Sequence, residues 1–364
     1  MKIINVVGAR PNFMKIAPIH RQMNISTKLH PILVHTGQHY DTKMSKIFFE
    51  ELSLPNPDVY LNVGSGSHAI QTAKIMIEFE KIILSEKPDL VLVVGDVNST
   101  LACSLVASKL NIKVAHVEAG LRSFDRKMPE EINRIITDSI SDYLFVSEKS
   151  GLNNLDNEGV PKDKVYYVGN VMIDSLKHHL KESKKSKIIQ NLKLSNEEFA
   201  LLTLHRPTNV DNKNKIIEIL ASIKIIQEKI DLVFPVHPRT LKNINSFGLK
   251  DTLDSMPNLH LLDSVGYIDF LSLMNSSKLV ITDSGGIQEE TTYLSIPCIT
   301  LRENTERPVT IELGTNELVD SKTQDIINAY DRVSNLNQRS KTKKTPKYWD
   351  GNAAKRIVNI IESI

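Results

Sequence analysis

LVITDSGGIQEE, residues 279–290, is the stretch from which the fold can be worked out. Its apolar, β-branched start predicts a buried strand, and a helix is expected after the turn Ser284-Gly285-Gly286. The two glycines allow the backbone to approach a ligand, and unpaired N–H groups at a helix start favour phosphate. Ser284 adds a hydroxyl group, and Glu290 is placed to accept hydrogen bonds from the hydroxyls of a ribose. The alternative is an ordinary strand-to-helix turn, which these residues taken alone favour.

The composition is that of a soluble globular protein. The chain has 364 residues, of which 41% are hydrophobic and 24% charged, which is enough for two α/β domains. The formal net charge of +2 calls for no nucleic acid. Two cysteines without metal-ligand spacing indicate a reducing compartment. Because no signal peptide and no long uncharged stretch occurs, no membrane association is expected and we predict a cytoplasmic protein.

Short β-branched runs alternate with longer amphipathic runs, a pattern typical of βαβ units and doubly wound parallel sheets. The first half has predicted strands at 2–7, 32–35, 90–94, 114–117, 143–146 and 165–168, and helices at 41–52, 68–84, 99–109 and 129–141. The second half has predicted strands at 200–203, 232–236, 259–261, 279–282, 298–300 and 317–319, and a terminal helix at 353–364. We therefore predict two Rossmann-like domains, residues 1–170 and 171–349, with the ligand in the cleft between them.

Charged side chains follow the predicted strands of the first half. Arg10 and Lys15 come after the first strand and suit a pyrophosphate, although ordinary surface charge is the alternative. Asp96 and Glu118 directly follow two neighbouring strands, which would aim two carboxylates into one crevice. Asp96 could instead cap the next helix. These residues predict an acidic, ligand-binding edge of the first sheet.

The helix predicted at 129–141 starts with two acids in its first turn. Compensation of the helix dipole explains Glu131 well enough. Arg134 lies one turn from Glu130 and is expected to help position it. The sequence therefore favours Glu130 as the functional acid of the pair.

Two histidines follow strands of the second half. His205 comes after the strand at 200–203 and His237 after the strand at 232–236. A single histidine at such a place is commonly a satisfied polar group. Two on one sheet, entering the cleft opposite the carboxylates, favour acid–base work beside the substrate.

A set of short motifs runs in order over nearly the whole chain. It comprises Gly8-Ala9-Arg10-Pro11 with Lys15, His35-Thr36-Gly37-Gln38-His39, Gly95-Asp96 with Ser99-Thr100, His116-Val117-Glu118-Ala119-Gly120-Leu121-Arg122, Pro129-Glu130-Glu131 with Asn133-Arg134, Gly169-Asn170 with Asp174, His205-Arg206, the residues from Asp283 to Glu290, and Thr305-Glu306-Arg307-Pro308. These motifs resemble those of the non-hydrolysing UDP-N-acetylglucosamine 2-epimerases.

This resemblance implies a GT-B-like architecture, a homodimer, a UDP-sugar substrate, and neither a nicotinamide cofactor nor a catalytic metal. It also implies that a terminal helix, residues 350–364, packs back on the first domain. The matching catalytic positions are Asp96, Glu118, Glu130 and His205. The matching binding positions are the cations Arg10, Lys15 and Arg134, the UDP-binding residues Ser284, Gly285, Gly286 and Glu290, and the uracil-contacting position of Phe270.

The implied reaction is reversible epimerisation at C2 of UDP-N-acetylglucosamine to UDP-N-acetylmannosamine. The C2 proton is not acidified by a neighbouring carbonyl group, so the family eliminates UDP in an anti sense to 2-acetamidoglucal and adds it back. Elimination requires a base at C2 and builds negative charge on the departing pyrophosphate. Re-protonation from the opposite face requires a second acid, which accounts for several carboxylates.

Two departures from the family keep other functions open. The family segments Gly-Thr-Arg-Pro-Glu and His-Arg-Arg-Glu-Asn are replaced by residues 8–12 and 205–209, and Tyr40-Asp41 replaces Arg-Glu. Allosteric activation by substrate is therefore in doubt, and a modified sugar such as a 2,3-diacetamido uronate or a 6-deoxy derivative is possible. Hydrolysis to free N-acetylmannosamine and UDP, and a glycosyltransferase of the same architecture, are further alternatives.

Overall fold

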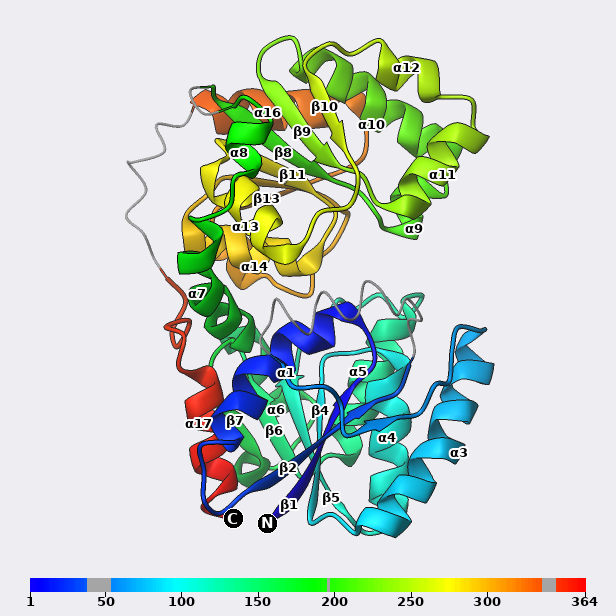
Figure 1. Cartoon of the computed structure of the whole chain (residues 1–364), viewed down its shortest axis with the longest axis vertical. Coiled ribbons are helices and arrows are strands. Elements are labelled where there is room, and N and C mark those ends of the chain that lie inside the picture. Colours follow the sequence, from blue (N-terminus) through cyan, green and yellow to red (C-terminus); the bar gives the residue numbers. More distant parts are fainter. Residues whose placement is uncertain (38–53, 195–196, 336–344) are drawn as a thin grey trace. The chain divides into compact units, whose positions relative to one another are not determined.

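The chain divides into two compact units. A computed structural model describes residues 1–37, 54–194, 197–335 and 345–364, apart from the side chains of Arg10 and Asn335. The first unit is formed by Met1–His178 with Pro346–Ile364, and the second by His179–Thr345 (Figure 1). The division falls inside helix α7 (Val171–Ser183), whereas we expected it before that helix. The predicted helix at 41–52 lies outside the described residues, as do the family positions 38–41.

The first unit contains a parallel sheet in the order β3-β2-β1-β4-β5-β6-β7. The strands are β1 (Lys2–Val7), β2 (His30–His35), β3 (Val59–Tyr60), β4 (Leu90–Val94), β5 (Lys113–Ala119), β6 (Tyr143–Val146) and β7 (Val165–Tyr167). Pairing of Val94 with Val117 brings the carboxyl ends of β4 and β5 together. The short β3 was not predicted, because two residues after a proline-containing segment have no readable period.

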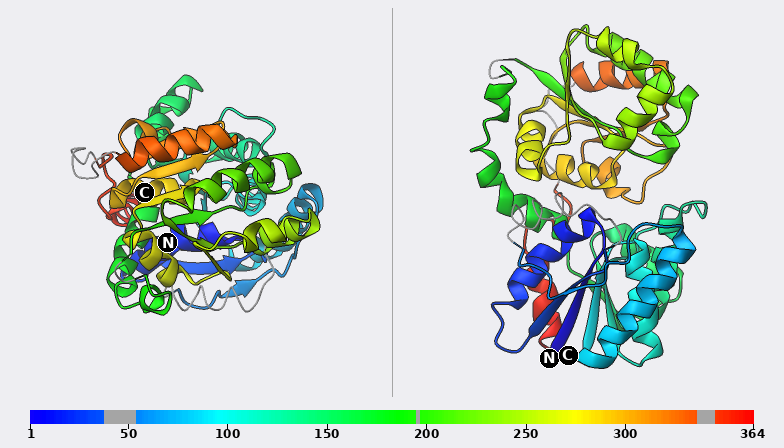
Figure 2. Two further views of the ribbon diagram at one scale, coloured as in Figure 1. Left: turned by 90° about the horizontal axis from the view of Figure 1, so that it is seen from above. Right: turned by 45° about the vertical axis from the view of Figure 1, so that its right-hand side comes forward.

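Helices pack on both faces of this sheet (Figure 1). Besides α7 they are α1 (Arg10–Met23), α3 (His68–Glu86), α4 (Asn98–Lys109), α5 (Pro129–Ile140), α6 (Lys149–Asn157), the 3₁₀ turn η1 (Lys162–Lys164) and α17 (Ala353–Ile361). The terminal helix α17 lies beside α1 (Figure 2). Its first amides, those of Ala353 and Ala354, donate to the carboxylate of Asp174 at 3.2 and 2.8 Å.

The second unit repeats the plan with the strand order β10-β9-β8-β11-β12-β13. Its strands are β8 (Phe199–Thr203), β9 (Asp231–Pro235), β10 (Leu259–Leu262), β11 (Leu279–Thr282), β12 (Cys298–Leu301) and β13 (Asn316–Val319). Its helices are α8 (Ile188–Asn191), α9 (Pro207–Val210), α10 (Lys213–Ile226), α11 (Pro238–Ser246), α12 (Lys250–Asp254), α13 (Tyr267–Ser276), α14 (Gly285–Leu294), α15 (Val309–Glu312) and α16 (Thr323–Asn335).

Both sheets are covered on two faces, which explains their composition. All five residues of β4, Leu-Val-Leu-Val-Val, are buried, as are the four residues of β11. Strands buried on both faces read as continuous apolar runs and not as an alternation. The predicted α/β fold with two doubly wound parallel sheets is therefore confirmed.

Among the described residues, no helix combines the length and the apolar character that crossing a membrane requires. The same residues contain no group of three or more His, Cys, Asp or Glu side chains arranged to hold a metal ion.

Candidate active site

Asp96 follows β4 and forms an ion pair with Arg134 on α5. The cap residue of α4 is Val97, and no side chain caps that helix. The capping alternative for Asp96 is therefore wrong. Its side chain is 29% exposed, so one carboxylate is held by a cation and still reaches solvent.

Glu118 ends up in an unusual backbone conformation. Its φ of +71° lies in the left-handed region, at a bulge where the pairing of β5 with β6 shifts between Val117 and Ala119. Such a conformation costs on the order of 1–3 kcal/mol in a non-glycine residue. Strained residues and bulges are found more often at functional sites than elsewhere. The bulge turns the Glu118 side chain toward Lys15 of α1, with which it forms a buried ion pair.

Lys15 thus has a role that the sequence did not suggest. We expected Lys15 to bind pyrophosphate. In the structure its ammonium group forms an ion pair with the carboxylate of Glu118. Gly95 makes room for it, because a Cβ at that position would lie 2.8 Å from Nζ of Lys15. At the start of α1, Asn12 Oδ1 accepts the amides of Gly8 and Ala9 at 3.2 and 2.9 Å. Those two amides are therefore already engaged.

The two acids at the start of α5 differ from our expectation. Arg134 bonds not to Glu130 but to Glu131, whose Oε2 lies 2.8 Å from Nη2. Glu131 is buried and also accepts the amides of Ser123 and Phe124 at 3.0 and 2.9 Å. Glu131 lies in the first turn of α5, where a carboxylate compensates the helix dipole, but its buried hydrogen bonds give it a further role that we had not predicted. Glu130 is half-exposed and makes no hydrogen bond or ion pair with any described residue.

In the second unit, Asp283 orients His205. The Nδ1 atom of His205 lies 3.0 Å from Oδ1 of Asp283, and the amides of His205 and Arg206 donate to the same carboxylate at 3.1 and 2.9 Å. Burial opposes ionisation of Asp283, but these partners outweigh it and lower its pKa. Since Nδ1 donates to Asp283, Nε2 is the nitrogen that can exchange a proton with a ligand. The His205 side chain is 43% exposed.

His237 lies beside His205, with 6.0 Å between the ring centroids. Its Nδ1 accepts the amide of Arg239 at 3.2 Å and so caps α11. The structure therefore brings the two predicted histidines together, but it gives His237 a capping function as well.

The turn after β11 opens into α14 at Gly285 as predicted. Ser284 is the cap residue, yet its hydroxyl makes no capping hydrogen bond, and no acidic side chain lies in the first turn. This helix start therefore keeps its positive character for an anion. A Cβ at Gly285 would lie 2.7 Å from Oε1 of Glu306. A bulky residue there would collide with the protein itself, so such a variant cannot test phosphate binding alone.

A cluster of charged side chains surrounds Glu306. Arg302 Nη2 donates to Glu306 at 2.8 Å, Arg206 approaches it at 3.9 Å, and Arg307 Nε lies 2.6 Å from Oε1 of Glu289. Burial disfavours the charge on Glu306, but the three guanidinium groups outweigh it and lower its pKa. Three cations against two carboxylates leave a net positive charge. The sequence pointed to this segment only through the family motif.

Glu290 is buried, and its Oε1 accepts a hydrogen bond from the hydroxyl of Tyr267 at 2.8 Å. Burial raises the pKa of Glu290 to about 7, against the lowering effect of the Tyr267 bond. Tyr267 lies on α13 together with the half-buried Phe270. Tyr267, which bonds to the predicted ribose-binding residue Glu290, thus lies on the same helix as the predicted uracil-contacting residue Phe270.

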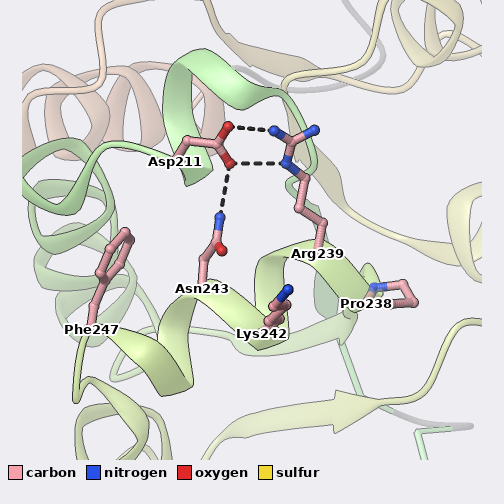
Figure 3. A pocket seen from close by; sticks show the side chains of 6 residues that line it. All are labelled: Asp211, Pro238, Arg239, Lys242, Asn243 and Phe247. Atoms are coloured by element: carbon pink, nitrogen blue, oxygen red, sulfur yellow. Dashed lines mark hydrogen bonds and ion pairs between the residues drawn. The ribbon is translucent and has the colours of Figure 1, made fainter. Parts of the chain in front are cut away.

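Figure 3 shows a hollow that is lined by Asp211 and by residues of α11, which begins directly after His237. There Asp211 accepts hydrogen bonds from Arg239 Nε at 2.9 Å and from Asn243 at 2.8 Å. None of the predicted site residues lines this hollow, and its Arg239 is already paired with Asp211. We therefore do not assign the substrate to it.

Comparison with known proteins identifies the family. The family model for UDP-N-acetylglucosamine 2-epimerase matches residues 21–362. The chain belongs to the UDP-N-acetylglucosamine 2-epimerase family. It is 46% identical to the UDP-N-acetylglucosamine 2-epimerase of Methanocaldococcus jannaschii, covering 99% of each chain. A crystal structure of that enzyme in complex with UDP-GlcNAc and UDP superposes with a TM-score of 0.92 over the whole of both chains.

Another member of the UDP-N-acetylglucosamine 2-epimerase family acts on a different sugar. The UDP-2,3-diacetamido-2,3-dideoxy-D-glucuronate 2-epimerase of Pseudomonas aeruginosa is 42% identical to this chain and covers 88% of each sequence. The predicted family and isomerase class are confirmed, while membership alone leaves the choice of sugar open.

Proposed function

We propose that this chain catalyses the reversible epimerisation at C2 of UDP-N-acetylglucosamine to UDP-N-acetylmannosamine. The observation that carries the proposal is the paired arrangement of Glu118 with Lys15 and Asp96 with Arg134 at two adjacent strand ends. The sequence relationship to the Methanocaldococcus enzyme supports the choice of substrate.

The proposed reaction breaks the C2–H bond and the bond from C1 to the pyrophosphate oxygen. One carboxylate takes the C2 proton, the C–H electron pair forms the C1–C2 double bond, and UDP leaves with the electrons of the C1–O bond. The products of this half-reaction are 2-acetamidoglucal and UDP. In the return step a proton is delivered to the opposite face of C2 and UDP re-forms its bond to C1. No hydride is transferred, so the reaction requires no redox cofactor.

The side chains of the first unit suit the proton transfers. Asp96, Glu118 and the half-exposed Glu130 supply carboxylates, and a base within hydrogen-bond reach typically contributes about 10²–10⁴-fold to a rate. Lys15 and Arg134 form ion pairs with two of these groups, Glu118 and Asp96.

The second unit suits the departing UDP. The uncapped start of α14 and the arginine cluster around Glu306 favour the developing negative charge of the pyrophosphate. His205, held by Asp283, can donate a proton from Nε2 to a phosphate oxygen. Glu290 and Phe270 are proposed to bind the ribose and the uracil.

The test is incubation of the purified protein with UDP-N-acetylglucosamine in deuterated water, followed by NMR. We expect UDP-N-acetylmannosamine with deuterium at C2, formed without added nucleotide cofactor or metal. A product that retains protium at C2 would overturn the elimination route. Accumulation of free N-acetylmannosamine with UDP would instead identify a hydrolysing enzyme.

A second candidate substrate is a UDP-2,3-diacetamido uronate. The observation that favours it is the 42% identity to the Pseudomonas enzyme, together with the departures at residues 8–12 and 205–209. Side-by-side turnover of the two nucleotide sugars decides between them, since the preferred substrate has the higher kcat/KM.

We further propose a homodimer. On α3, three large apolar residues repeat every seven positions, with Ile70, Ile77 and Leu84 exposed to 54%, 58% and 59%. This spacing places them on one face of the helix, where a second copy can cover them. Light scattering should give twice the mass of one chain, and Ile77→Lys should give a monomer. Ile225→Lys, at an exposed isoleucine of α10, is the matched control.

The proposed setting is the cytoplasm, on a route to surface polysaccharide. Both cysteines are free and buried, which suits a reducing compartment. Fractionation of cells and loss of the sugar from surface polysaccharide after gene deletion would test this.

A further inference from the structure

His116 faces a hydrogen-bond acceptor at each ring nitrogen. It is fully buried on β5, with Nδ1 2.7 Å from Oδ1 of Asp138 and Nε2 2.8 Å from the carbonyl oxygen of Gly95. A carbonyl oxygen only accepts, so Nε2 carries a hydrogen. Burial opposes the charge on Asp138, but His116 and Arg122 outweigh it and lower the pKa of this carboxyl group. Nδ1 therefore donates as well, so that each ring nitrogen of His116 serves as a hydrogen-bond donor.

The second oxygen of Asp138 holds the chain after β5. Oδ2 accepts the amide of Gly120 at 3.0 Å and Nη1 of Arg122 at 2.7 Å. Arg122 also donates to both carboxylate oxygens of Glu158, at 2.8 and 2.7 Å. Both carboxylate oxygens of Asp138 are thus engaged by donors of the first unit.

The segments held in this way carry two candidate catalytic carboxylates. Gly95, whose carbonyl His116 binds, directly precedes Asp96. Gly120, whose amide Asp138 binds, follows Glu118 by two residues. Gly95, Glu118 and Gly120 all have positive φ values of 68°, 71° and 80°. Glycine adopts a positive φ readily, but Glu118 keeps it only where surrounding contacts enforce it.

We propose that Asp138 and His116 are positioning residues that set Asp96 and Glu118 relative to each other. The carboxylate of Asp138 binds His116, which in turn binds the carbonyl oxygen of Gly95, directly before Asp96. The same carboxylate binds the amide of Gly120, two residues after Glu118. The inference rests on the proposed function, in which a proton leaves one face of C2 and returns on the other. Two groups that serve opposite faces must keep a fixed separation, and a misplacement of about 1 Å can cost on the order of 10²-fold in rate.

The test compares Asp138→Asn with Asp142→Asn. Asp142 is a matched control because it accepts the amide of Val114 at 3.0 Å and Nζ of Lys113 at 2.8 Å, at the other end of β5. In Asp138→Asn we expect kcat to fall about 10²-fold, UDP affinity to stay within about twofold, and more 2-acetamidoglucal and UDP to be released per turnover. A purely structural role would lower the melting temperature and leave this partition unchanged. A folded Asp138→Asn protein with wild-type kcat would overturn the proposal.

Two measurements keep the proposal testable whatever the turnover of the variant. In ¹⁵N NMR spectra of the wild-type protein, both ring nitrogens of His116 should be protonated, and one unprotonated nitrogen would contradict the pairing. His116→Gln combined with Asp138→Asn should lose no more activity than the worse single variant, because the two act as a unit.

If the wild-type protein does not epimerise any UDP-sugar, the proposed function fails. A crystal structure of Asp138→Asn with Asp96 and Glu118 in place would refute the positioning role alone.

Discussion

Glu131 and Arg134 are joined by two hydrogen bonds within one turn of α5, 3.1 Å from Nε and 2.8 Å from Nη2 to the same carboxylate oxygen. The remaining nitrogen of Arg134, Nη1, pairs with Asp96. Glu131 therefore orients the cation that holds Asp96. Its neighbour Glu130 makes no hydrogen bond or ion pair with any described residue and is the acid that we propose for catalysis.

The first prediction separates these two acids. Glu131→Gln removes a buried charge that accepts five hydrogen bonds, so the free energy of unfolding should fall by on the order of 1–3 kcal/mol. Turnover should fall as well, because Glu131 orients Arg134. Glu130→Gln should lower kcat by about 10²–10⁴-fold and change stability by less than about 0.5 kcal/mol. Urea titrations beside kcat measurements check both. Equal stability losses would show that the two roles are wrongly divided.

The second prediction concerns the buried pair of Lys15 and Glu118. Glu118→Gln should abolish most turnover and also destabilise the protein by roughly 3–5 kcal/mol, because it leaves a buried cation without its anion. Adding Lys15→Met should restore much of the stability and none of the activity. Asp96→Asn, whose carboxylate is partly exposed, should lose turnover with a smaller stability loss. UDP affinity should be largely kept in all three, and a stable, inactive Glu118→Gln protein would contradict the buried-pair argument.

The third prediction uses two glycines with similar backbones. Gly95 and Gly64 have φ values of +68° and +74°, but only at Gly95 would a Cβ meet a neighbour, Nζ of Lys15 at 2.8 Å. Both alanine variants should lose on the order of 1 kcal/mol or more from the strained backbone. Only Gly95→Ala should also lose turnover, because it displaces Lys15 from Glu118. Loss of activity in Gly64→Ala would point to backbone strain instead of displacement.

The strand ends explain why much of the site could be predicted. In a parallel sheet the carboxyl ends of the strands meet at one edge, so residues such as Asp96, Glu118 and His205 are marked by position alone. The apolar runs that mark these strands follow from burial on both faces.

Pairing between side chains far apart in the sequence could not be predicted in the same way. The left-handed backbone of Glu118 depends on a bulge between β5 and β6, and a bulge leaves no pattern in one strand read alone. Similarly, Arg134 lies three residues from Glu131 and four from Glu130, and both spacings allow contact on a helix. Arg134 pairs with Glu131 because Glu131 is the buried one of the two acids. That burial depends on the loop at Ser123, whose amide and hydroxyl donate to Glu131.

The last prediction concerns Glu290 and pH. Its pKa is about 7 in the folded protein, above the ordinary value of 4.5 because of burial, so the folded state holds a proton that the unfolded state has lost. Stability therefore falls as the pH rises from about 4.5 to 7, by up to about 3 kcal/mol from this group. Glu290→Gln removes the titration, so the variant should exceed the wild type in stability at pH 8, and this advantage should shrink toward pH 5.

Urea titrations of both proteins at pH 5 and pH 8 measure this difference, and Glu312→Gln is the matched control because it removes an exposed carboxylate instead of a buried one. Isothermal titration with UDP at pH 8 completes the argument, because an ionised Glu290 is the form that accepts hydrogen bonds from ribose hydroxyls. The variant should there bind UDP more weakly by roughly 1–3 kcal/mol. Suppose that Glu290→Gln gains stability at pH 8 but binds UDP as tightly as the wild type. That result would support the burial of the Glu290 carboxyl group and would contradict its proposed role in ribose binding.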